Sequence, residues 1–181
     1  MRTQRLFAYA FAVCLVSLVA GPAMADVESG NFNAFLQGQY QVNGTVTCST
    51  GPTVESIGSE PTLFDTFTGV ITYDGHGHAT LKDEGVDIGT GSPDIFVDET
   101  CTYSYEVARD GSFTQTSSCT DAGKSYLLSG ITERGQIGVG GSVLITNQIG
   151  TDVETLEVPP GNIIQYRICG GVGTAVRIHP Q

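Results

Sequence analysis

The sequence predicts an all-β protein, an antiparallel up-and-down β-barrel of about eight to ten strands. Apolar and polar residues alternate with a period of two along most of the chain, whereas helical periodicity is nearly absent. Short segments rich in Gly, Asp, Asn and Pro separate the alternating runs, as tight turns do. A long meander closes into a barrel more readily than it leaves two open edges, and a β-sandwich is the alternative.

The first 25 residues differ from this pattern and predict a secretory signal peptide. Arg2 and Arg5 give it a positive start, and an apolar run follows from Leu6 to Ala20. Ala23-Met24-Ala25 has the small-x-small pattern of a cleavage site. We therefore expect residues 26–181 to form a single β-barrel domain that is periplasmic or secreted, with no membrane span after processing.

The charge of the chain excludes some classes of partner. The full sequence carries 19 acidic residues against 8 Lys and Arg, a formal net charge of −11. Removal of Arg2 and Arg5 leaves 6 − 19 = −13 for the mature chain. So acidic a domain repels phosphate backbones and anionic lipids, and we expect no nucleic-acid partner.

The clearest strand comes first in the mature chain, at residues 36–48, after a helical turn at residues 31–35. Alternate positions from Leu36 through Tyr40 to Cys48 share one largely apolar face, while the intervening Gln, Asn and Thr share the other. One face is therefore expected in a core and the other in water.

The later strands follow the same pattern between turn signals such as Asp74-Gly75-His76-Gly77 and Arg134-Gly135. Two glycine runs, 138–141 and 170–173, are expected where barrel strands bend. The expected strands are 64–73, 78–86, 96–108, 112–120, 125–133, 136–146, 152–158, 162–169 and 174–178.

Four cysteines remain once the signal peptide has removed Cys14, and an even number in an oxidising compartment predicts two disulfides. A three-residue hairpin loop at residues 109–111 pairs Ala108 with Ser112, which places Cys101 opposite Cys119. The predicted bridges are therefore Cys101–Cys119 and Cys48–Cys169, and the second ties the first strand to a late one.

One difficulty concerns the side-chain phase of residues 162–169. The apolar alternation places Ile164, Tyr166 and Ile168 inward, which turns Cys169 outward, whereas Cys48 faces inward. A β-bulge near Gly170 is expected to reconcile the two cysteines.

Aromatic residues recur on the inward faces and are the candidate ligand-binding residues. In one interpretation they fill the core; in the other, phenols lining a barrel bind a small apolar or amphipathic ligand. We also expect Arg167 or Arg177 to close the barrel end by stacking on an aromatic such as Tyr40. The candidate residues are Tyr40, Tyr73, Tyr103, Tyr105, Tyr166 and Phe67.

Known catalytic motifs are missing from the sequence. It contains no Gly-x-Ser-x-Gly, His-Glu-x-x-His or Walker motif, so we expect no catalytic residues, no cofactor and no enzyme. His76 and His78 form a His-Gly-His pair that could bind zinc, but the surrounding residues also make a hairpin turn. We expect no metal site there.

The densest acidic segment, residues 83–99, is expected to be a loop. It offers oxygen ligands of the kind that calcium prefers, although the spacing matches no calcium-binding motif, or it keeps the domain soluble. Acidic loops also motivate an alternative function, a protein-interaction module or inhibitor in the cell envelope. The acids are Asp83, Glu84, Asp87, Asp94, Asp98 and Glu99.

Two resemblances bear on the fold. Leu36-Gln-Gly-Gln-Tyr40 after a helical turn resembles the Gly-x-Trp opening of lipocalins, with Tyr40 in place of Trp, and an Arg in a late strand is another trait of that family. The mature chain also resembles small exported bacterial proteins of unknown function, which share this opening, the turn at 74–77 and a Tyr-Arg-Ile-Cys segment as at 166–169. The resemblances imply a lipocalin-like barrel and no particular activity.

Overall fold

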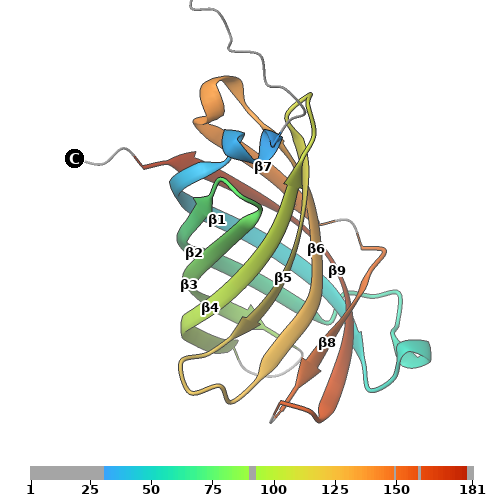
Figure 1. Ribbon diagram of the computed structural model, residues 1–181. Helices are drawn as coiled ribbons and strands as arrows, with labels where there is room; N and C mark the ends of the chain where they lie inside the picture. Colours follow the sequence, from blue (N-terminus) through green and yellow to red (C-terminus); the bar gives the residue numbers. More distant parts are fainter. Residues whose placement is uncertain (1–30, 90–92, 149, 159, 179–181) are drawn as a thin grey trace, which may run out of the picture.

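The computed structural model describes residues 31–89, 93–148, 150–158 and 160–178. In these residues, nine antiparallel strands form one sheet in the order β1-β2-β3-β4-β5-β6-β7-β9-β8, and β1 also pairs with β9 (Figure 1). The sheet therefore closes into an up-and-down barrel, lipocalin-like in outline. The predicted fold class is confirmed, and the β-sandwich alternative is wrong. The predicted signal peptide, residues 1–25, lies outside the described residues.

The strands are β1 (Gln37–Gly51), β2 (Leu63–Asp74), β3 (His78–Ile88), β4 (Pro93–Val107), β5 (Ser112–Thr120), β6 (Leu127–Ile137), β7 (Val143–Gln148), β8 (Val153–Glu157) and β9 (Ile163–Arg177). Three short 3₁₀ helices accompany them: η1 (Phe32–Phe35), η2 (Val54–Ser56) and η3 (Val139–Gly141). The helical turn predicted at 31–35 is therefore confirmed as η1. None of the helices in the described part of the chain has the length and apolar character that a membrane crossing requires.

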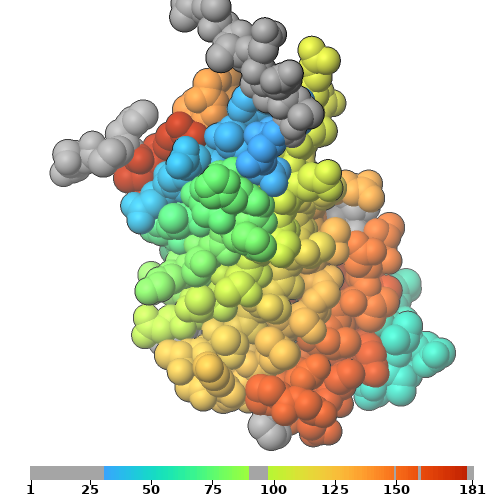
Figure 2. All heavy atoms as spheres, in the orientation of Figure 1, coloured from blue at the N-terminus to red at the C-terminus, as the bar shows by residue number. Residues whose placement is uncertain are grey.

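Strands β7 and β8 share one position in the barrel wall. Both lie between β6 and β9: β7 pairs with the end of β6, and β8 pairs with its beginning. Two short strands in one line thus complete a wall of eight positions. On the face seen in Figure 2, β2 to β6 lie against one another as a continuous surface.

The predicted turn Arg134-Gly135 is instead a position within a long strand, because it lies inside β6. The glycine run 170–173, expected where a barrel strand bends, lies inside β9. A Cβ added at Gly135 would lie 2.4 Å from the Phe113 ring, and one at Gly171 would lie 2.5 Å from the Thr45 carbonyl oxygen. These glycines therefore permit close packing inside the barrel wall. In the sequence, a glycine that is needed for close packing looks the same as one that is needed for a turn.

The register of the strands confirms both predicted disulfides. Cys101 is paired with Cys119 across β4 and β5, and Cys48 with Cys169 across β1 and β9. Both pairs are bonded, with Cα–Cα distances of 4.0 and 4.1 Å respectively. The second bridge joins the two strands that close the barrel.

The side-chain phase predicted for β9 is wrong. Arg167 and Cys169 are buried, and the alternation turns Tyr166 to the outer face, where it is half-buried. Pairing of β1 with β9 runs without a shift from Tyr40 to Gly51, so the predicted bulge near Gly170 is not found there. The error arose because β9 carries its apolar residues outside and a cation inside, the reverse of the usual pattern.

Candidate functional site

Helix η1 closes one end of the barrel, the upper end in Figure 1. The Val107 amide donates to Asn33 Oδ1 at 2.8 Å, and the Tyr105 hydroxyl donates to the Leu36 carbonyl at 2.9 Å. Leu36, directly after η1, has no exposed surface. The sequence therefore forms a fixed cap, because side chains of η1 and β4 satisfy each other's polar groups.

Three of the candidate tyrosines pack against one another below this cap. The rings of Tyr40 and Tyr73 are 5.6 Å apart and those of Tyr73 and Tyr105 are 5.1 Å apart, both in edge-to-face geometry. All three side chains are buried. Edge-to-face contact is the preferred arrangement of aromatic pairs, so these residues form a packed core in this half of the barrel.

Arg177 closes the same end from outside the tyrosines. Its guanidinium carbon lies 5.2 Å from the centre of the Tyr40 ring, and its Nη2 donates to the Tyr40 hydroxyl at 2.6 Å. That hydroxyl donates in turn to the Gly141 carbonyl at 2.9 Å. The prediction that an arginine of a late strand stacks on Tyr40 is confirmed for Arg177.

A cavity of about 70 Å³ lies farther along the interior, beyond the packed tyrosines. Phe67 and Tyr103 line it, whereas Tyr40, Tyr73, Tyr105 and Tyr166 do not. The structure thus separates the six candidate residues into two that line the cavity, three that pack the closed end and one on the outer face. Both disulfides also line the cavity, together with Val46, Leu63, Leu81, Leu128 and Ile131.

Five carboxyl groups and one guanidinium line the same cavity. They come from different strands: Asp65 from β2, Asp83 from β3, Glu99 from β4, Glu133 from β6, Glu154 from β8 and Arg167 from β9. Carboxylates are among the groups least often buried without a partner. Which of them have partners therefore decides what the cavity can bind.

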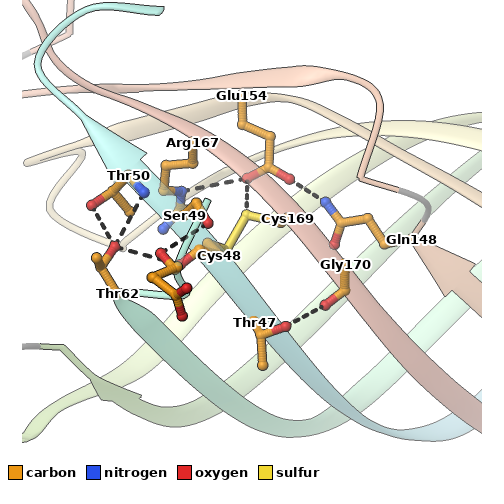
Figure 3. The surroundings of a disulfide bond; sticks show 11 residues. Thr47, Cys48, Ser49, Thr50, Thr62, Gln148, Glu154, Arg167, Cys169 and Gly170 are labelled. Carbon is orange, nitrogen blue, oxygen red and sulfur yellow. Dashed lines mark hydrogen bonds and ion pairs between the residues drawn. A yellow bond between two sulfur atoms is a disulfide. The ribbon is translucent and has the colours of Figure 1, made fainter. Parts of the chain in front are cut away.

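Glu154 is held by two partners beside the Cys48–Cys169 disulfide (Figure 3). Gln148 donates from its side-chain amide to Glu154 Oε1, and Arg167 Nε lies 3.4 Å from Glu154 Oε2. The Arg167 contact is close enough for an ion pair, but it lacks the alignment of a hydrogen bond. Burial raises the pKa of Glu154, and the Arg167 charge opposes this rise.

Glu99 and Glu133 also have hydrogen-bond donors. The Tyr126 hydroxyl donates to Glu99 Oε2, and Gln115 Nε2 donates to Glu133 Oε2 at 2.5 Å. Gln115 accepts in turn from the Tyr73 hydroxyl at 3.0 Å, which links the packed tyrosines to the cavity. Burial raises the pKa of both glutamates, and these hydrogen bonds oppose the rise.

Asp65 and Asp83 differ from the three glutamates. Each has a buried Oδ1 without a hydrogen-bond partner among the described residues, and the Asp83 side chain is only 8 % exposed. Burial raises the pKa of Asp83 to about 8, with smaller contributions from Glu99 and Asp65. Burial likewise raises the pKa of Asp65 to about 7, with contributions from Asp87 and Glu99. Both carboxyls are poised to take up or lose a proton near neutral pH.

The acidic segment 83–99 was wrongly predicted as a loop. β3 continues to Ile88 and β4 begins at Pro93, so Asp83 and Glu99 lie inside paired strands and face the interior. The sequence held a signal for this: Ala79, Leu81 and Asp83 are alternate residues and therefore share one face. The side chain of Asp94 lies outside the described residues.

Two candidate metal sites have other roles in the structure. Asp74 Oδ1 accepts from the backbone amides of both His76 and His78, at 2.6 and 3.0 Å, so this segment forms a hairpin turn. Among the described residues, one group of three potential ligands is close together, Glu99 with Cys101 and Cys119. These two cysteines are joined in a disulfide and offer no thiolate to a metal.

Comparison with known proteins finds similarity among solved structures. No protein-family model matches the sequence, and no similar sequence is found among curated proteins. The solved structure of an S-type phycobiliprotein lyase from Guillardia theta is similar over 83% of this chain and 92% of that chain, with a TM-score of 0.35 and 7% sequence identity. At such values the likeness assigns neither activity nor ligand to this chain.

The same comparison corrects one prediction. The protein from Guillardia theta is named a lyase, so the comparison does not support the prediction that the present chain is not an enzyme, and that prediction is withdrawn. That prediction was based on missing motifs alone. The motifs that we sought belong to hydrolases and phosphate-binding proteins, so their absence does not exclude other chemistry.

Proposed function

We propose that this protein binds one small amphipathic molecule inside its barrel. The observation that carries the proposal is the mixed lining of the interior cavity described above. Apolar side chains such as Phe67, Leu81 and Ile131 line it beside carboxyl groups with unsatisfied oxygens. Ligand sites typically combine apolar walls with a few polar groups that fix orientation.

The size of the cavity limits the ligand. Its volume is about 70 Å³, whereas sites for drug-sized molecules measure about 300–1,000 Å³. Benzene occupies a cavity of about 150 Å³ in a protein interior. The enclosed part of the ligand therefore has only a few non-hydrogen atoms. The small apolar or amphipathic ligand that the sequence predicts is limited to this size.

We also propose that residues 26–181 act outside the cytoplasm. The two disulfides support this, because such bonds persist in oxidising compartments. The pattern of residues 1–25 supports it as well. Mass spectrometry of the exported protein, with and without reduction, tests this: we expect cleavage after Ala25 and a gain of four hydrogens on reduction. An uncleaved or fully reduced protein contradicts export.

Methyl NMR tests ligand binding directly. We expect members of a library of small amphipathic fragments to shift the methyl signals of Leu81, Leu128 and Ile131 in a saturable way. Leu144, which is fully buried and does not line the cavity, is the internal control. A Leu128→Phe variant fills part of the cavity and is expected to abolish the shifts while the Leu144 signal stays in place. If no fragment moves the cavity methyls, the proposal fails.

A further inference from the structure

We propose that the interior site selects a small organic cation, whose ammonium group is bound by Asp83. This inference rests on the proposed function and gives the ligand its charge. Asp83 on β3 is paired with Gly69 on β2, so the second aspartate, Asp65, lies four residues farther along β2, and both line the cavity. An ammonium group has three N–H donors and no acceptor, so it complements carboxylate oxygens that have no donor of their own.

The hydrogen bonds of the cavity leave these two residues free for a ligand. Each glutamate that lines it already accepts a hydrogen bond: Glu99 from Tyr126, Glu133 from Gln115 and Glu154 from Gln148. In contrast, Asp65 and Asp83 each keep a buried oxygen without a donor among the described residues. Buried polar atoms in folded proteins nearly always have a partner, so two carboxyl oxygens without one in the same cavity indicate a missing donor.

The charge of the lining determines the sign of the ligand. Among the described side chains, the cavity lining contains five carboxyl groups and one guanidinium. The guanidinium belongs to Arg167 and is already paired with Glu154. An anion would meet several like charges in a medium of low dielectric constant, where repulsion is strong. A neutral ligand offers no charge to a carboxylate, whereas an ammonium group compensates the ionised form of Asp83 and donates to its unpaired oxygen.

The geometry favours an organic cation over a metal ion. Calcium takes six to eight oxygen ligands at short distance. Among the described residues, the acidic side chains of the cavity do not bring three carboxyl ligand atoms together within 4.8 Å. An ammonium ion needs only two or three acceptors, and its hydrocarbon part fits against Phe67 and Leu81, which line the same cavity.

Binding is coupled to proton release. Because burial raises the pKa of Asp83 to about 8, this carboxyl is largely protonated in the empty protein at pH 7. A bound ammonium ion favours the ionised carboxylate, so the proton leaves Asp83 as the cation binds, and affinity rises with pH up to about 8. The charged and titratable groups that act on the two aspartates are Glu99, Asp87, Glu154, Arg167, Tyr103 and Tyr126.

The test is a titration of the disulfide-bonded protein with ethylammonium, which has three non-hydrogen atoms. Calorimetry and the Leu81 methyl signal report binding. Affinity for so small a ligand is millimolar at best, so the protein is titrated with tens of millimolar ligand. We expect ethylammonium to bind at least tenfold more tightly than ethanol and propionate, and tenfold more tightly at pH 8 than at pH 6. Calcium chloride at equal ionic strength is the fourth ligand.

Matched variants assign the site. Asp83→Asn removes the carboxylate that binds the ammonium group and is expected to weaken ethylammonium binding at least tenfold, whereas Asp65→Asn removes a more distant charge and is expected to weaken it less. Asp83→Asn also reduces the proton release that calorimetry in two buffers of different ionisation enthalpy detects. Glu84→Gln is the control, because Glu84 is the exposed neighbour of Asp83 on β3. It removes the same charge from the outer face and is expected to leave affinity unchanged.

The outcomes separate this inference from the proposed function. If ethanol or propionate binds as tightly as ethylammonium, or if Glu84→Gln and Asp83→Asn act alike, cation selection by Asp83 is overturned while ligand binding stands. Tighter binding of calcium overturns the organic cation in favour of a metal. If none of the four ligands and no fragment of the NMR library binds, the proposed function fails with it.

Discussion

The two halves of the barrel interior differ in how closely they are packed and in whether their polar groups have hydrogen-bond partners. Near η1, Tyr40, Tyr73 and Tyr105 stack in edge-to-face contact, and each of their hydroxyls has a hydrogen-bond partner. Beyond them the interior is hollow and lined with carboxyl groups, two of which have an unsatisfied oxygen. In the half near η1, the side chains are closely packed and the hydroxyl groups are hydrogen-bonded, as in a stable core. In the other half, a cavity remains and two carboxyl oxygens lack a hydrogen-bond donor.

This difference indicates where stability and function reside. Buried carboxyls and an unfilled volume cost free energy, and a protein retains such features mainly at functional sites. Both disulfides line the hollow half, where packing contributes least. We infer that the aromatic half stabilises the barrel through packing and that crosslinks hold the hollow half open. Four measurements test this difference between the two halves.

The largest effect is expected from loss of the Cys48–Cys169 bridge. The double substitution Cys48→Ala/Cys169→Ala should lower the free energy of unfolding by about 5 kcal/mol, because the bridge closes a loop with a sequence separation of 121. Loss of Cys101–Cys119, with a separation of 18, should cost about 3 kcal/mol. Urea denaturation checks both values. Equal losses would show that loop length does not govern these bridges.

Truncation of the aromatic half comes next. Tyr73→Ala should cost about 3–5 kcal/mol, because Tyr73 packs against two other tyrosines and its loss leaves a cavity. Tyr166→Ala is the control from the outer face and should cost far less. Thermal and urea unfolding of the two variants provide the measurement. A similar loss for both would contradict the assignment of the core to this half.

The pH dependence of stability tests the hollow half. Burial raises the pKa of Asp65 and Asp83 in the folded protein to about 7 and about 8, both above their usual value of 3.8, so between pH 4 and pH 8 the folded state binds more protons than the unfolded one. Stability without ligand should therefore be fully present below about pH 4 and fall by several kcal/mol as pH rises to about 8.

Urea denaturation at pH 5.5 and pH 8.5 measures this trend. The double variant Asp65→Asn/Asp83→Asn should flatten the profile and be more stable than the parent at pH 8.5. A profile that rises with pH, or one that the double variant leaves unchanged, would place the titrating groups elsewhere.

The smallest effect concerns the hydroxyls of the aromatic half. Tyr40→Phe should cost about 2 kcal/mol, because its hydroxyl accepts from the Arg177 guanidinium and hydrogen bonds to charged groups are the stronger ones. Tyr105→Phe should cost about 1 kcal/mol, because its hydroxyl donates to a neutral carbonyl. Unfolding in urea at pH 7 gives both values. A larger loss at Tyr105 would contradict the role given to Arg177 in closing the barrel.

The fold class and the crosslinks could be predicted from the sequence. The period of two in residues such as 36–48 identifies strands, and the hairpin before Ser112 sets the register that pairs Cys101 with Cys119. Both signals are local, because alternation and turn chemistry act over a few residues. Stacking of a late arginine on Tyr40 was also predictable, since a barrel brings its first and last strands together.

Which side of each strand faces inward, and which residues it contacts there, became clear only in the folded barrel. In β9 the alternation was visible, but Tyr166 and Arg167 exchange their expected sides because the interior at that level is polar. Glycines such as Gly135 resembled turn signals, although they give room to a neighbouring ring. The carboxyls of the cavity come from five strands far apart in the sequence, and no local pattern could unite them. These carboxyls come together because the strands close into a barrel, and closure depends on pairing between strands that are far apart in the sequence.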